Sequence, residues 1–162
     1  EPAAGEHTQQ TVLPDIGNHD FNFGYEALRD YLRAMDGVCL CANVEDLGGE
    51  LPIRPWAVHT LANGLRVGIT GVVTDFVNVW EQPQNLEQLR VTNTFQAART
   101  ACSALQDQCD VRVCIYHGGF EERVGNGAGC SRTAERILPV KSLGNWTSTF
   151  SSQATNTWRW KG

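Results

Sequence analysis

The sequence lacks the features that mark membrane proteins and nucleic-acid-binding proteins. No stretch reaches the roughly 18 apolar residues of a membrane-spanning helix, and no signal-peptide pattern is present. Basic residues are scarce: 13 Lys and Arg stand against 18 Asp and Glu, for a formal net charge of −5. A surface that binds a nucleic acid polymer needs clustered Lys and Arg. We therefore expect neither a membrane nor a nucleic acid polymer among the partners.

The six cysteines form no Cys-x-x-Cys pair, so the sequence does not predict a zinc–cysteine site. Cys39, Cys41 and Cys114 lie within apolar, strand-like runs. We interpret the cysteines as buried thiols, which are typical of a reducing compartment. This interpretation and the missing signal peptide favour a cytoplasmic location.

The chain has 162 residues, of which 41% are hydrophobic, and it is long enough for one domain with a core. Apolar residues at helical spacing predict two helices, over residues 25–35 and from 94 to about 106. The first helix would bury Leu28, Leu32 and Met35, with Tyr31 beside them, and the second Phe95, Ala98, Cys102 and Leu105. Thr92 or Asn93 could cap the second helix.

Buried strands are expected over residues 38–44 and 111–116. Residues 57–62 and 65–73 flank Asn63-Gly64, the strongest short signal for a hairpin, while residues 85–91 read as a linker or a short strand. Helices and strands thus alternate, which predicts a layered α/β fold. In such folds the functional groups gather in loops at strand ends.

Two polar clusters carry candidate chemistry, Gly17-Asn18-His19-Asp20 and His117-Gly118-Gly119. An asparagine oxygen can bind a cation, and a histidine can exchange a proton near neutral pH. The following Asp20 could orient or charge the imidazole of His19. His117 ends an apolar strand, at a position typical of functional groups.

Each cluster also has a purely structural interpretation, and the residues alone leave the choice open. Asn18, Asp20 and Asn22 could bond to the main chain in a turn that leads into the helix. His117 could be a satisfied structural residue. We expect His59, which lies among apolar residues, to be structural.

Three segments in order resemble the calcineurin-like metallophosphoesterases of the 5′-nucleotidase and 2′,3′-cyclic-nucleotide phosphodiesterase type. They are Gly17-Asn18-His19-Asp20-Phe21-Asn22-Phe23-Gly24, the hairpin through Val67-Gly68-Ile69-Thr70-Gly71-Val72-Val73-Thr74, and Tyr116-His117-Gly118-Gly119-Phe120-Glu121. The resemblance covers about residues 13–121. It implies an α/β fold, part of a layered α-β-β-α sandwich with mixed sheets, and a partial metallophosphoesterase domain over residues 1–122.

The resemblance also implies an activity. The family hydrolyses phosphate esters, and this type acts on nucleotides, with two divalent metal ions such as Mn, Zn or Fe that activate a water. Asn18 and His117 would be metal ligands. His19 would face the substrate phosphate and assist the leaving oxygen, with Asp20 holding its charge state. A separate domain usually grips the base, and many relatives are exported.

The sequence departs from this family in its ligand blocks. The family takes further ligands from an Asp-x-His block, a Gly-Asp block and a late Gly-His-x-His block, and none of these is present here. Only two of the expected metal ligands remain, so the site would be incomplete. The alternative to an enzyme is therefore a catalytically incompetent fragment, or a binding module that keeps part of the fold.

Residues 123–162 differ in character from the rest of the chain. They are rich first in Gly and then in Ser, Thr, Asn and Trp, and neither the helical nor the strand period fits them. Codons permitted for residues 144–162, read in a shifted frame, can encode Gly-His-Gln-His, the block that is missing. We therefore predict an atypical tail that is frame-shifted or poorly ordered.

Overall fold

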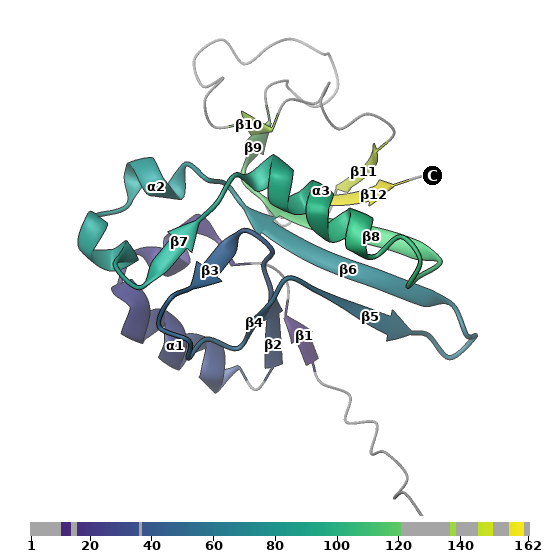
Figure 1. Ribbon diagram of the computed structural model, residues 1–162, viewed down its shortest axis with the longest axis horizontal. Coiled ribbons are helices and arrows are strands. Elements are labelled where there is room, and N and C mark those ends of the chain that lie inside the picture. Colours follow the sequence, from purple (N-terminus) through teal and green to yellow (C-terminus); the bar gives the residue numbers. More distant parts are fainter. Residues whose placement is uncertain are drawn as a thin grey trace, which may run out of the picture.

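The computed structural model describes residues 11–13, 16–35, 37–120, 137–138, 146–150 and 156–160. Side-chain surroundings are described for 16–35 and 37–118. Within these ranges the protein consists of helices packed on mixed sheets, which confirms the α/β class (Figure 1). In this part of the chain no helix is long and apolar enough to cross a membrane.

The largest sheet has five strands in the order β11-β12-β8-β6-β5. Its strands are β5 (Trp56–Thr60), β6 (Arg66–Val73), β8 (Val111–His117), β11 (Trp146–Phe150) and β12 (Asn156–Trp160). β6 and β8 are parallel, whereas the other neighbours are antiparallel. The hairpin β5–β6 turns at the predicted Asn63-Gly64, where Gly64 has a φ of 84°, a conformation that favours glycine.

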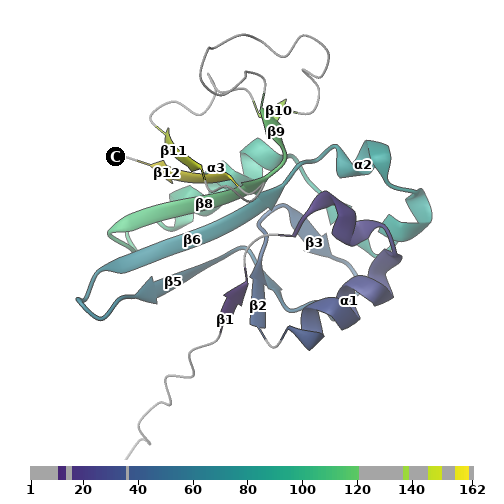
Figure 2. The same ribbon diagram turned by 180° about the vertical axis from the view of Figure 1, so that it is seen from behind.

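Helix α3 (Thr94–Ala104) connects the parallel strands β6 and β8 and covers one face of the sheet, as both views show (Figures 1 and 2). The predicted cap is confirmed, since the side chain of Asn93 accepts a hydrogen bond from the Gln96 N–H at 3.0 Å. Successive residues of a strand face opposite ways. Val72 therefore packs in the core with α3, while Val73 packs in the core on the other face.

Helix α1 (Gly24–Ala34) packs on a parallel sheet of three strands, β1 (Thr11–Leu13), β2 (Gly37–Leu40) and β4 (Ile53–Arg54). It buries Tyr25, Leu28 and Leu32. The prediction that Met35 and Tyr31 join this face was wrong, since they are 41% and 49% exposed. Met35 lies just beyond the last helical residue, and Tyr31 lies on the flank of the buried stripe.

The single strand predicted over residues 38–44 is two strands. β2 ends at Leu40, and β3 (Val44–Asp46) pairs instead with β7 (Leu89–Val91) in a separate two-stranded sheet. Between them the chain turns at Asn43, a buried residue whose side chain bonds to a neighbouring strand. A tertiary hydrogen bond therefore divides this apolar run.

Short elements complete the described chain: η1 (Asn18–Phe21), α2 (Val77–Trp80), η2 (Pro83–Leu86), β9 (Gly119–Phe120) and β10 (Ile137–Leu138). α2 and η2 were not predicted, because a single turn leaves no periodic pattern. β10, β11 and β12 lie in the atypical tail, where no element was expected, and β12 pairs with β8. The rest of the tail lies outside the described residues, and a domain boundary near residue 122 stays a prediction.

Burial of the cysteines follows the prediction for the part of the chain with described side chains. Cys39, Cys41, Cys102 and Cys114 are buried, whereas Cys109 is half-buried. Burial raises the pKa of Cys102 to about 12, so its thiol stays protonated at neutral pH. Cys130 lies outside the described residues.

Asn43 joins three segments from a completely buried position. Its Nδ2 donates to the carbonyls of Val73 at 2.8 Å and Thr92 at 3.2 Å. Its Oδ1 accepts from the Val73 N–H at 2.9 Å and from the Cys41 thiol at 3.5 Å. The side chain thereby holds the last residue of β6 against the start of β3 and the end of β7.

We predict that Asn43→Ala lowers the free energy of unfolding by about 3 kcal/mol, because it leaves buried main-chain groups without partners. Urea unfolding followed by circular dichroism measures the change. Asn78→Ala is the matched control, since Asn78 also donates to two carbonyls, of Asp75 and Val91, from an exposed position, and its loss should be smaller. Equal losses in the two variants would contradict the role given to Asn43.

Candidate active site

The candidate site lies at the carboxyl ends of the parallel strands β6 and β8. In their register Val73 is opposite His117, and the N–H of the next residue, Thr74, donates to the His117 carbonyl at 2.9 Å. Ends of parallel neighbours meet at one edge of the sheet, where loops collect functional groups. His117 therefore stands at the edge that the sequence pattern indicated.

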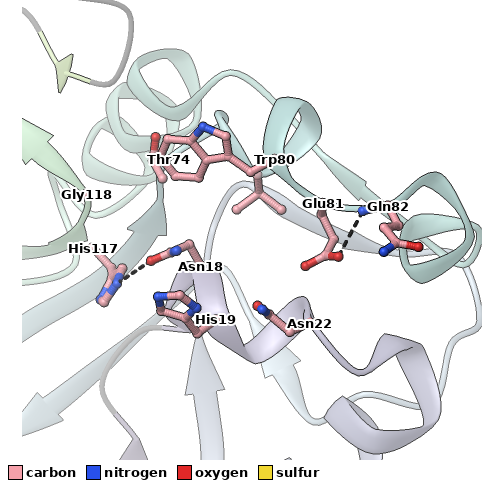
Figure 3. Close-up of a pocket in the computed structure, with 10 residues that line it drawn as sticks. Asn18, His19, Asn22, Thr74, Trp80, Glu81, Gln82, His117 and Gly118 are labelled. Atoms are coloured by element: carbon pink, nitrogen blue, oxygen red, sulfur yellow. Dashed lines mark hydrogen bonds between the residues drawn. The ribbon is translucent and has the colours of Figure 1, made fainter. Parts of the chain in front are cut away.

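Asn18 and His117 meet although they are 99 residues apart in sequence. The Oδ1 of Asn18 lies 3.1 Å from the Nε2 of His117, and both side chains are half-buried. Figure 3 shows them pointing toward one another, with His19 beside them. The structure thus brings together the two residues that were predicted as metal ligands.

Gly17 permits this approach. A Cβ at its position would lie 3.1 Å from Cε1 and 3.2 Å from Nε2 of His117, tighter than ordinary contact. Its φ of −88° is ordinary for any residue. The glycine is therefore needed here for space and not for its backbone conformation.

His19 and Asp20 take different positions in the loop. The side chain of His19 is exposed and lines the same cleft. The Oδ2 of Asp20 accepts a hydrogen bond from the Gly17 N–H at 2.8 Å. The side chains described here show no hydrogen bond or ion pair between His19 and Asp20, so the predicted influence of Asp20 on His19 has no direct contact behind it. Asp20 thus bonds to the main chain, as the structural interpretation of this cluster expected, whereas the side chain of Asn18 faces His117 instead.

Electrostatics at the site favour a neutral His117. Burial lowers the pKa of His117 below its ordinary value of 6.5, the charge of Asp20 opposes this effect, and the nearby His19 adds to it. The lowering prevails, so His117 is neutral at physiological pH. A neutral imidazole nitrogen is the form that binds a metal ion.

A cleft of about 750 Å³ opens between these residues and the segment that follows β6 (Figure 3). Its lining consists of Asn18, His19, Asn22, Thr74, Val77, Trp80, Glu81, Gln82, His117 and Gly118. Sequence reasoning missed the wall formed by Thr74, Val77 and residues 80–82. Only their position just after a central strand could have indicated them, because loops at strand ends hold the functional groups of α/β folds.

The donor set fits part of a metal centre. Two donors that bind one ion at about 2.1 Å lie roughly 3.0 to 3.4 Å apart at octahedral or tetrahedral angles, and the Asn18 and His117 donors are 3.1 Å apart. In the described segments, no group of three or more His, Cys, Asp or Glu side chains could hold an ion. This part of the chain therefore offers two donors for one ion.

Comparison with known proteins finds no family model that matches this chain. Two curated proteins are similar in sequence. The chain is 29% identical over 138 residues to the trifunctional nucleotide phosphoesterase YfkN of Bacillus subtilis, covering 79% of this chain and 9% of that protein. It is 22% identical over 124 residues to the 2′,3′-cyclic-nucleotide 2′-phosphodiesterase/3′-nucleotidase of Salmonella typhimurium, covering 70% and 19%. The chain thus spans less than a fifth of either relative.

Solved structures of similar proteins agree with this result. The structure of a "Putative 5'-Nucleotidase" from Staphylococcus aureus matches with a TM-score of 0.65 and 29% identity, over 75% of this chain and 24% of that one. The calcineurin-like phosphoesterase YfkN from Bacillus subtilis matches with a TM-score of 0.55 and 27% identity, over 70% and 37%. The resemblance indicated by the motifs is confirmed: in sequence and in fold, this chain is similar to calcineurin-like phosphoesterases and 5′-nucleotidases.

Proposed function

We propose that this chain carries one side of the active site of a phosphate ester hydrolase that acts on nucleotides with the help of divalent metal ions. One observation carries the proposal. The Asn18 Oδ1 and the His117 Nε2 converge to 3.1 Å at the edge of a cleft that His19 also lines. A cation ligand pair beside an exposed imidazole suits the hydrolysis of a phosphate ester.

The relatives support the class of substrate. One is named as a nucleotide phosphoesterase and another as a cyclic-nucleotide phosphodiesterase and nucleotidase. The substrate proposed here is accordingly a small phosphorylated molecule, with nucleotides first. A net charge of −5 does not oppose an anionic substrate, because a bound cation supplies positive charge locally.

Each residue of the loop has a defined task in this proposal. Asn18 and His117 hold a metal ion through their facing oxygen and nitrogen. His19 reaches the phosphate from its exposed position and gives a proton to the leaving oxygen. Asp20 keeps the loop in shape through its bond to Gly17. Divalent ions held there would activate a water and neutralise charge on the phosphate.

The alternative, a chain that hydrolyses nothing, is favoured by the number of ligands. Two donors rarely hold an ion tightly, and the described segments offer no cluster of three or more acidic, histidine or cysteine side chains. The remaining ligands would have to come from the blocks that the family adds. We therefore propose weak metal binding and no turnover for this chain alone.

A paramagnetic ion tests the proposed donor pair. We expect Mn²⁺ to broaden the imidazole NMR signals of His19 and His117 well before that of His59, because the broadening falls steeply with distance from the ion. Asn18→Ala or His117→Ala should raise the Mn²⁺ concentration needed to broaden His19 at least about fivefold, through loss of one of two ligands. His59→Ala is the control, and unchanged broadening in the Asn18 variant would refute the ligand pair.

The close packing of Gly17 offers a second test. Gly17→Ala should weaken Mn²⁺ binding about tenfold, because a methyl group at this position displaces the His117 ring. Gly49→Ala is the matched control: its φ of 75° makes the substitution costly by about 1 kcal/mol, but nothing lies within 4 Å of the added carbon. The control should lower stability and leave Mn²⁺ binding intact. Equal Mn²⁺ binding in both variants would show that the approach of His117 to Gly17 is irrelevant.

Activity separates the enzyme from the incompetent fragment. We expect this chain to show no turnover of p-nitrophenyl phosphate with added Mn²⁺. A longer product of the same gene that contains the Asp-x-His and Gly-His-x-His blocks should be active, and His19→Ala in it should lower kcat/KM by roughly 10² to 10⁴ through loss of the proton donor. Robust metal-dependent turnover by this chain would contradict the argument from missing ligands. A longer product with the blocks but without activity would contradict the proposed function.

A further inference from the structure

We propose that Asn85 is a positioning residue for His19. Its side-chain amide, oriented by Glu81, holds the main-chain carbonyl of Asn22 and so fixes the loop on which His19 enters the cleft. The inference rests on the proposed function, in which His19 acts on the phosphate. It assigns a task in that function to residues 81–85, for which the sequence pattern predicted none.

The side chain of His19 depends on its loop for its position. It is exposed, so the main chain that carries it sets where the imidazole lies. The start of η1 is well anchored, because Asp20 closes the turn with a hydrogen bond of 2.8 Å and completely buried Phe21 packs in the core. The loop then leaves through Asn22, which is exposed and lines the cleft. A contact to Asn22 from the facing wall is therefore placed to fix the end of the loop nearest the solvent.

The amide of Asn85 provides that contact. Its Nδ2 donates to the Asn22 carbonyl at 3.1 Å and to the Glu81 Oε1 at 2.9 Å. An amide nitrogen carries two hydrogens, so each of them has an acceptor. The opposite orientation of the amide would turn its oxygen toward two acceptors. The two contacts therefore determine which way the group faces.

Glu81 orients the amide and is itself held. Its Oε1 also accepts a hydrogen bond from the Gln82 N–H at 2.9 Å. Figure 3 shows Glu81 and Gln82 along the side of the cleft that faces Asn22. A hydrogen bond to an ionised acceptor is about twice as strong as one between neutral groups. The carboxylate therefore keeps one hydrogen of Asn85 in place and directs the other to Asn22.

The main chain on both sides leaves room for this contact. Asn85 belongs to η2, and the next residue, Leu86, packs against the core that contains Phe21. Across from it, Gly24 begins α1 with a φ of 79°, which favours glycine, and a Cβ there would lie 3.3 Å from the Asn85 Oδ1. The hydrogen bond to the loop thus joins two segments that pack on one core and meet closely.

His117 stands outside this arrangement. It belongs to β8, where the pairing with β6 holds it. Loss of the Asn85 contact should therefore loosen the loop of His19 and leave His117 as it is, whereas a general loss of stability would affect both. This difference separates a positioning role from a purely structural one.

Backbone order parameters from ¹⁵N NMR relaxation of the metal-free chain test the inference. Asn85→Asp nearly keeps the size of the side chain, removes both N–H donors and sets a carboxylate against two acceptors. It should lower the order parameters of the His19 and Asn22 amides from about 0.85, typical of rigid backbone, to about 0.7 or less, with His117 unchanged. Gln84→Glu is the matched control. It makes the same chemical change at an exposed position of η2 and should leave all three amides at their wild-type values.

A double variant distinguishes the contact with Asn22 from the contact within the wall. In Glu81→Gln combined with Asn85→Asp, the new amide at position 81 can donate to the new carboxylate at position 85, while the Asn22 carbonyl still lacks its donor. The free energy of unfolding in urea should recover toward the wild-type value while the order parameter of His19 stays low. Recovery of both together would overturn the inference, as would equal order parameters in Asn85→Asp and Gln84→Glu.

Mn²⁺ broadening of the imidazole signals of the same variants separates this inference from the proposed function. Broadening falls steeply with distance from the ion, so the ratio of His19 to His117 broadening should change at least about twofold in Asn85→Asp and stay constant in Gln84→Glu. An unchanged ratio in Asn85→Asp would overturn the positioning role. A chain whose order parameters respond as described, but whose wild type shows no Mn²⁺ broadening, would count against the proposed function alone.

Discussion

The parallel pairing of β6 with β8 is the constraint on which the rest of the site depends. It sets Val73 opposite His117 and brings the chain on into Thr74, whose N–H bonds to the His117 carbonyl. The following residues form the far wall of the cleft. Parallel strands need a crossover, and α3 provides it on one face while the core around α1 occupies the other. The pairing register of β6 and β8 thus places both His117 and the residues after β6 at the cleft.

Buried polar groups secure that register. Asn43 bonds to both main-chain groups of Val73, and Thr94 donates its hydroxyl to the same carbonyl at 2.9 Å. A slip of one residue would leave these groups unsatisfied in the core and would turn Val72 and Val73 to the wrong faces. The hydrogen bonds of Asn43 and Thr94 therefore stabilise one alignment of β6, and with it the position of the residues that follow β6 in the cleft wall.

The loop that holds Asn18 and His19 is closed by a hydrogen bond within it and is tied to the facing segment by a second one. Asp20 closes the turn on the Gly17 N–H, while Asn85 holds the Asn22 carbonyl from the facing segment. The absence of a side chain at Gly17 lets the His117 ring approach closely. The facing pair of donors is a product of these contacts, which come from segments far apart in the sequence.

The long periodic segments could be predicted from the sequence by itself: the helix at 25–35, the capped helix from Thr94, the Asn63-Gly64 hairpin and the strand that ends at His117. The motif clusters around residues 18 and 117 could be found in the same way, because they stand at the ends of such segments. Local spacing carries this information. The division of the apolar run at Asn43 depends on the tertiary structure, since the hydrogen bond between Asn43 and Val73 joins residues 30 apart. The exposure of Met35 at the end of α1 is also visible only in the structure. The tertiary structure alone set the Asn18 and His117 atoms face to face and made Trp80 and Glu81 a wall of the same cleft, because contacts across the fold leave no local pattern in the chain.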